Sequence, residues 1–111
     1  MSYVAPVKDI AFLLNHVVGL DKLARLDGFE EASADLVEAI LEESAKFTAD
    51  VLAPLNWVGD QQGSQWNDGA VTTPEGWKEA YTQFVESGWG SLSFPTEFGG
   101  QGLPMTVAAA V

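Results

Sequence analysis

A glycine-rich run at residues 99–102, Gly-Gly-Gln-Gly, is the segment whose composition could most directly serve chemistry. Such a run before a helix can bind a phosphate group through backbone N–H groups. It does not match a dinucleotide-binding fingerprint, because the third glycine counted from Gly100 would have to occupy the position of Met105. It also lacks the lysine of a nucleotide-binding P-loop. We therefore predict that these glycines serve a tight turn.

Side chains that could act as nucleophile or base do not form a recognisable set. The single histidine, His16, lies four residues after Phe12 on a predicted helix and outside its apolar stripe, so we expect a surface or interface residue. The chain has no cysteine, which excludes disulfides, cysteine nucleophiles and thiolate metal sites. No serine can be paired with a base from its spacing. The sequence therefore assigns no catalytic, cofactor-binding or metal-binding residue.

Acidic side chains are abundant, but their spacing does not favour a metal or acid–base site. Those on the longest predicted helix fall outside its apolar arc, which predicts a solvated face. Residues 60–68 lack the pattern of a calcium-binding loop. The acidic pairs in question are Glu30/Glu31, Asp35/Glu38 and Glu42/Glu43.

Two further patterns are weighed as ligand sites. Ser33 followed by Asp35 is faintly similar to the modified serine of an acyl carrier, but the order of the residues is wrong, and a helix N-cap is the better interpretation. Trp77 lies on a predicted core face. The other three tryptophans fall in predicted loops, where they could form a stacking platform but are expected in the core or an interface; Trp57 and Trp66 are expected to hold their loop to the body.

Charge and composition exclude several classes of partner. The 111 residues include sixteen acidic and five basic ones, for a net charge of −11, and 47% are hydrophobic. This composition supports a folded core and argues against binding to nucleic acid or to an anionic membrane surface. No apolar run reaches the roughly 20 residues of a membrane span. Residues 10–20 lack the flanks of a signal peptide, and we expect a cytoplasmic protein.

The pattern of apolar residues predicts an all-α fold, a small bundle of about four helices with two long irregular loops. Helices are predicted at residues 8–18 and 33–52, the second ending at Pro54. A third begins at residues 73–75, where Thr-Pro-Glu forms a start signal, and ends at Gly88. The predicted loops are residues 55–73 and 90–104, and a last helix begins near residue 105 and is truncated by the end of the chain.

The second predicted loop carries a resemblance to a known family. Residues 88–104 read GWGSLSFPTEFGGQGLP, in which a helix ends in glycine and a Pro-x-x-x-Gly-Gly-x-Gly turn leads into the next helix. This order resembles the acyl-CoA dehydrogenase family. A subgroup with an extended N-terminus is similar at further motifs, which are Tyr3-x-x-Pro6-x-x-Asp9-x-x-Phe12-Leu13-Leu14, Gly28-Phe29-Glu30, Leu52-Ala53-Pro54-Leu55-Asn56, Gly59-Asp60 and Val71-x-Thr73-Pro74-Glu75-Gly76.

The resemblance implies that residues 1–30 form an N-terminal extension with short helices and residues 31–111 the N-terminal helical domain of a larger enzyme. That enzyme would oxidise an acyl-CoA to the 2,3-enoyl-CoA with FAD and a glutamate base, as in fatty-acid β-oxidation, and would pass electrons to electron-transfer flavoprotein. Its family forms homo-oligomers. The base and the FAD contacts lie outside the segment that resembles this chain, and Glu97 in the turn is structural rather than the base.

The apolar end Val-Ala-Ala-Ala-Val has no helix cap, so we expect a fragment cut inside a helix. We expect such a fragment to be inactive, to bind no FAD, to contribute a wall of the acyl-CoA site and to self-associate through apolar faces. The alternative is a stand-alone acidic interaction module without enzymatic activity.

Overall fold

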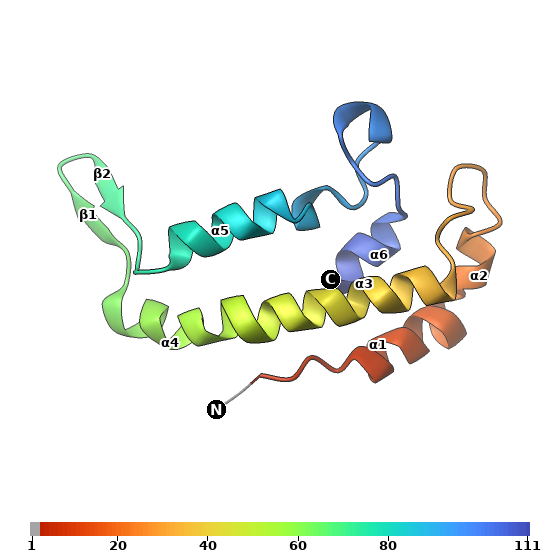
Figure 1. Ribbon diagram of the computed structural model, residues 1–111, viewed down its shortest axis with the longest axis horizontal. Coiled ribbons are helices and arrows are strands. Elements are labelled where there is room, and N and C mark those ends of the chain that lie inside the picture. The colour runs from red at the N-terminus through yellow and green to blue at the C-terminus, as the bar shows by residue number, and fades with distance from the viewer. Residues whose placement is uncertain (1–2) are drawn as a thin grey trace.

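The computed structural model describes residues 3–111, which form a flat, mostly helical molecule of 52 × 36 × 18 Å. Figure 1 shows one long helical rod, with the N-terminal helix on one side of it and the returning chain on the other. Within residues 3–111, no helix combines the length and the apolar character needed to span a bilayer.

The N-terminal helix has two halves. Helix α1 (Val7–Phe12) continues without a break into a π-helical segment, Leu13–Val18. Gly19, with φ +80°, ends it and leads into the single turn α2 (Leu20–Leu23). The predicted helix at residues 8–18 is thus confirmed, with a wider second half.

The rod is longer than predicted. Helix α3 (Ala34–Phe47) passes through the π-helical segment Thr48–Leu52 into α4 (Ala53–Gln62), so the prediction that Pro54 ends the helix is wrong. Proline lacks an N–H and its ring collides with the preceding turn of a regular helix. The π-helical segment lies immediately before α4. Pro54 occupies the first turn of α4, where a residue does not have to donate a backbone N–H to the preceding turn.

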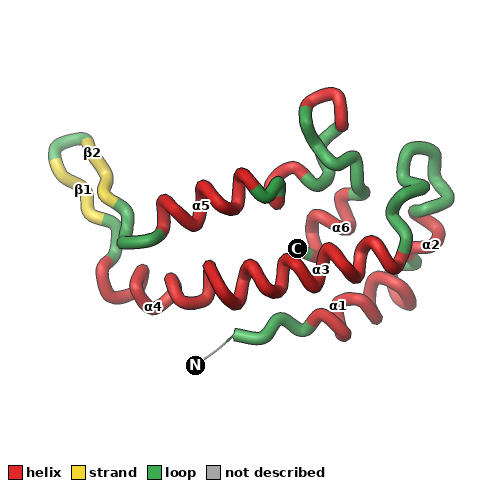
Figure 2. The backbone as a smooth tube through the Cα atoms, in the orientation of Figure 1, coloured by secondary structure: helices red, strands yellow, loops and turns green. Residues whose placement is uncertain are grey.

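The predicted loop at residues 55–73 is also wrong, because α4 is followed by a hairpin. Strand β1 (Gln65–Asn67) pairs antiparallel with β2 (Ala70–Thr72), with Trp66 opposite Val71, and Figure 2 shows the two strands at one end of the molecule. The connecting Asp-Gly pair has positive φ at both residues, which suits a two-residue hairpin turn. The fold is therefore broadly helical, not strictly all-α.

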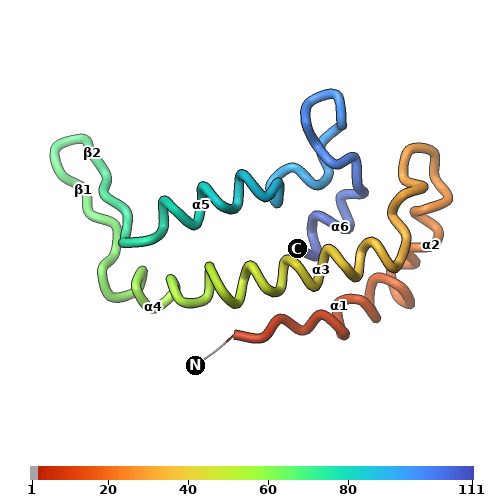
Figure 3. The backbone as a smooth tube through the Cα atoms, viewed as in Figure 1, coloured from red at the N-terminus to blue at the C-terminus, as the bar shows by residue number. Residues whose placement is uncertain are grey.

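The chain then returns along the rod. Helix α5 (Trp77–Glu86) starts after Gly76 rather than at residues 73–75. Two 3₁₀ turns follow: Trp89–Ser91 at the start of the second predicted loop and Thr96–Phe98 inside it. Helix α6 (Met105–Ala110) comes next. Figure 3, coloured along the chain, shows that α6 brings the C-terminal end back to the middle of the rod.

The hydrophobic core lies at one end of the rod, between α1, α3, α6 and the turn before α6. Val37 and Leu41 from α3 and Val107 from α6 are almost inaccessible to solvent. The remaining buried members are Leu14, Leu20, Ala32, Leu92 and Leu103. The apolar arc predicted for residues 33–52 supplies this core, as expected for an amphipathic helix.

Candidate functional site

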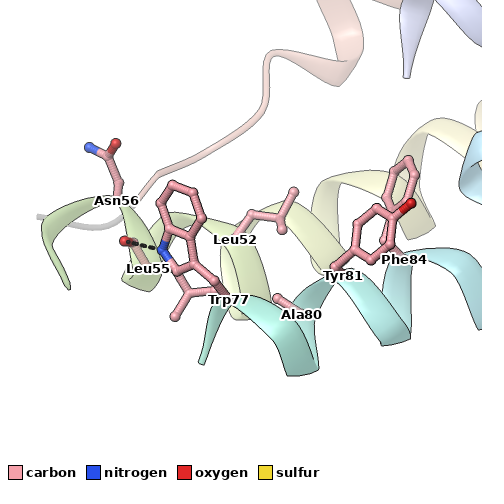
Figure 4. A pocket seen from close by; sticks show the side chains of 7 residues that line it. All are labelled: Leu52, Leu55, Asn56, Trp77, Ala80, Tyr81 and Phe84. Atoms are coloured by element: carbon pink, nitrogen blue, oxygen red, sulfur yellow. Dashed lines mark hydrogen bonds between the residues drawn. The ribbon is translucent and has the colours of Figure 1, made fainter. Parts of the chain in front are cut away.

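An apolar hollow of about 430 Å³ lies between the rod and α5. Figure 4 shows that one wall comes from the rod and the other from the first two turns of α5. The lining residues are Leu52, Leu55, Asn56, Trp77, Ala80, Tyr81 and Phe84. Its volume and apolar lining are in the range of small-molecule sites.

The position of Trp77 shapes this cavity. Its indole N–H donates a hydrogen bond to the carbonyl oxygen of Leu55 over 3.4 Å, drawn in Figure 4. The indole lies against Gly59, where an added Cβ would come within 2.4 Å of Trp77 Cζ2. Trp77 is 43% exposed, so the prediction of a core residue is wrong: it forms a wall of an open cavity.

The cavity can hold an apolar group but has little chemistry to offer. Its polar side chains are the amide of Asn56 and the hydroxyl of Tyr81. Neither is a strong acid or base near neutral pH. The lining can therefore contact an apolar ligand, but it supplies no group for acid–base catalysis.

The glycine turn is closed by its own hydrogen bonds. The N–H groups of Gly100 and Gly102 donate to the carbonyls of Pro95 and Phe94 at 3.1 and 2.9 Å, and Leu103 donates to Leu92 at 2.9 Å. Phe98, Gly99 and Gln101 donate to Pro95, Thr96 and Ser91 in the same way. The backbone groups that a phosphate would need are thus used inside the turn, which confirms the prediction of a structural role.

Gly100 is the position in this turn that admits no side chain. A Cβ there would lie 2.0 Å from the carbonyl oxygen of Phe94. Glycine permits the two backbone segments to touch. Glu97, in the same turn, has its side chain in solvent.

His16 and Ser33 each have a local structural role. The imidazole of His16 is exposed and lies 4.9 Å from the Phe12 ring, centroid to centroid. Ser33 Oγ accepts a hydrogen bond from the N–H of Leu36 at 3.2 Å, which confirms the predicted N-cap of the long helix.

The acidic pairs singled out in the sequence are exposed, and among residues 3–111 no group of three candidate ligands is arranged to hold a metal ion. One acid has a defined environment: hydrogen bonds from its own backbone N–H and from that of Gly28 lower the pKa of Glu30. On the exposed side of α3, the ion pair with Glu43 raises the pKa of Lys46.

Sequence reasoning missed the cavity because it placed residues 55–62 in a loop. A signal was present: Leu52 and Leu55 are three residues apart, a helical spacing that continues the arc of the long helix beyond its predicted end. The apolar face of α5 was predicted, but its partner was not.

The chain is similar in sequence to curated acyl-CoA dehydrogenases. It is 44% identical, over 99% of its length, to 3-methylmercaptopropionyl-CoA dehydrogenase of Ruegeria pomeroyi. It is 32% identical over 80% of its length to a butyryl-CoA dehydrogenase of Syntrophomonas wolfei, and 25% over 98% to a broad-specificity linear acyl-CoA dehydrogenase of Mycobacterium tuberculosis.

The matches cover this chain but only a small part of its relatives. It spans 19% of the Ruegeria protein, 15% of the Syntrophomonas protein and 18% of the Mycobacterium protein. No family model matches the chain. The chain is therefore a homologue of the acyl-CoA dehydrogenases, and it corresponds to about a fifth of the length of such a protein.

Proposed function

We propose that this chain is the N-terminal helical domain of a longer flavin-dependent acyl-CoA dehydrogenase, with residues 31–111 as the domain and residues 1–30 as an extension. The observation that carries the proposal is the 44% identity over 99% of the chain to a protein of which the chain spans 19%. A chain that corresponds to one segment of a longer homologous protein is expected to show such similarity along its whole length.

The longer protein would oxidise an acyl-CoA to the 2,3-enoyl-CoA in fatty-acid or related acyl-CoA breakdown. In the longer protein FAD would supply the hydride acceptor, and a glutamate outside this chain would supply the base. Electron-transfer flavoprotein would then reoxidise the flavin. We further propose a homo-oligomer in the cytoplasm. The names of the relatives suggest a sulfur-containing acyl group, a butyryl group or a range of linear acyl groups as substrate.

In this proposal the chain contributes a wall of the acyl-CoA site and interdomain packing, not chemistry. The pyrophosphates of FAD and CoA need cations or free backbone N–H groups. The chain has five basic residues against sixteen acidic ones, and Arg25 and Lys46 are paired with Asp21 and Glu43. With the turn amides also engaged, the residues of this chain do not fit a pyrophosphate site, and the base and flavin contacts are assigned to other parts of the protein.

The test compares the purified longer protein with the 111-residue chain. The longer protein should be yellow and should convert acyl-CoA to enoyl-CoA with an artificial electron acceptor. A panel of 3-methylmercaptopropionyl-CoA, butyryl-CoA and longer linear acyl-CoA would identify the preferred substrate. The short chain should be colourless and inactive. Stoichiometric flavin on the short chain would refute its purely structural role. A longer protein that lacked flavin or activity would refute the proposal that it is a flavin-dependent dehydrogenase.

The alternative, a stand-alone acidic interaction module, is not favoured by the homology. The coding sequence decides between the two. Several hundred codons that continue the reading frame beyond Val111 are expected for the dehydrogenase, whereas a stop codon close to Val111 would support the module.

A further inference from the structure

Two segments of this acidic chain contain no charged residue, although they lie far apart in sequence. Residues 10–20 and 101–111 hold none of the sixteen acidic and five basic side chains. In the structure these two segments line one hollow of about 590 Å³. The lining residues are Ile10, Leu13, Leu14, Val18, Met105, Thr106, Ala109 and Ala110.

Large apolar side chains on these two segments face solvent, and three of them, Leu13, Val18 and Met105, line the hollow. The five that are 49–69% exposed, which we call the charge-free surface, are Phe12, Leu13, Val17, Val18 and Met105. Val17 lies one turn beyond Leu13 on the π-helical segment, next to Val18. The core-facing sides of the same elements are filled by Leu14 and Val107, which are buried. These exposed side chains are thus additional to the core.

The chemistry of this surface indicates what can cover it. Contiguous exposed apolar side chains mark interaction sites, and the centres of protein interfaces are depleted in charge. The sixteen acidic and five basic side chains all lie outside these two segments. A partner that docks here meets no carboxylate from α6 or from the π-helical segment, and its matching surface should be apolar.

We propose that the charge-free surface is the face on which the remaining polypeptide of the longer protein docks, through apolar side chains packed between the N-terminal helix and α6. The chain spans 19% of its Ruegeria relative, so about four-fifths of such a protein lies outside it and must contact it somewhere. This inference rests on the part of the proposed function that makes the chain one segment of a longer protein.

The experiment measures backbone hydrogen exchange at residues 13–18 in the longer protein and in the 111-residue chain, each with and without Val17→Ser. Exchange at these amides should be at least about tenfold slower in the longer protein, because opening must also break the docked contact. Val17→Ser should speed it about tenfold there, since a buried valine loses its apolar contact. In the short chain Val17→Ser should change the exchange rate by less than about twofold, because valine and serine have similar helix propensity.

The matched control is Val85→Ser on α5, a valine that is 54% exposed and adjacent to Glu86. It should leave exchange at residues 13–18 unchanged in both proteins. Equal exchange in the two wild-type proteins would overturn the proposal. The 111-residue chain is measured at a dilution at which light scattering finds it monomeric, so that a second copy does not cover the surface.

The outcome is separable from that of the proposed activity. A longer protein that forms enoyl-CoA but shows no added protection rejects the docking face alone. Added protection without enoyl-CoA formation retains the docking face and rejects the activity.

Discussion

The two ends of the α3–α4 rod are built differently. At the α3 end, α1, α6 and the glycine turn surround the rod and bury Val37 and Leu41. At the α4 end, α5 lies beside the rod and the hairpin extends beyond them (Figure 1). Helix α4 has no buried residue, both strands are exposed, and α5 buries only Ala80.

This difference shows that an apolar stripe becomes a core only when enough neighbours cover it. The arc on the rod continues from Leu41 to Leu52, yet Leu41 is 2% exposed and Leu52 is 38% exposed. Local stability follows burial of apolar contacts. We therefore expect the core end to set the stability of the chain and the cavity end to open first.

The largest effect should separate two leucines of the same rod. Leu41→Ala should lower the free energy of unfolding by about 2–5 kcal/mol, because it leaves a cavity in the core. Leu52→Ala should cost about 1 kcal/mol, because its side chain is already part-exposed beside an open cavity. Denaturant unfolding of both variants measures the difference, and equal costs would contradict the contrast between the ends.

A pair of glycine substitutions sharpens the same contrast. Gly100→Ala should destabilise by about 1–3 kcal/mol, because its Cβ collides with the backbone carbonyl of Phe94, which cannot move alone. Gly59→Ala collides with the exposed Trp77 side chain, which can shift at the cost of its long hydrogen bond to Leu55, while the helix gains about 1 kcal/mol of propensity. Gly59→Ala should therefore be close to neutral. Thermal unfolding of both variants tests this. A larger destabilisation by Gly59→Ala than by Gly100→Ala would place the more rigid contact at the cavity end.

A smaller effect is expected at the hairpin. Trp66 is 73% exposed and lies opposite Val71. Trp66→Ser should cost about 0.2–1 kcal/mol, the range of a cross-strand aromatic pair. Urea unfolding followed by circular dichroism measures it. A cost near that of Leu41→Ala would mean that the hairpin is part of the core.

The smallest effect is electrostatic and lies at the core end. The backbone N–H groups of Glu30 and Gly28 stabilise the ionised Glu30 carboxylate and lower its pKa. Its contribution to stability is therefore present above the pKa of unfolded glutamate and is lost as the pH falls through the lower folded pKa. Glu30→Gln should be less stable than wild type at pH 7, and the two should converge in acid. A stability difference between wild type and Glu30→Gln that does not change with pH would exclude the ionised Glu30 carboxylate as its cause.

Local signals in the sequence predicted much of the core end. The N-cap Ser33, the arc through Val37 and Leu41 and the closed glycine turn were predicted because each depends on residues close together in the chain. The resemblance to acyl-CoA dehydrogenases, carried by residues 88–104, came from the same local order.

The errors are concentrated at the cavity end. Pro54 was expected to end the helix, but the π-helical turn before it accommodates the ring. Residues 55–73 were expected to be irregular, and Trp57 and Trp66 were expected to hold them to the body; both side chains are largely exposed. Propensity alone could not distinguish a loop from a helix followed by a hairpin.

The sequence by itself determined the acidic character, the mainly helical class, the tight glycine turn and the resemblance to acyl-CoA dehydrogenases, because these follow from composition, periodicity and residue order. Only the tertiary structure decided which parts of each apolar stripe are buried. It also decided that α5 and the rod line an open cavity, and that two uncharged segments about ninety residues apart line another hollow. Burial depends on how many elements cover a face, and that number is set by the path of the whole chain rather than by any one segment.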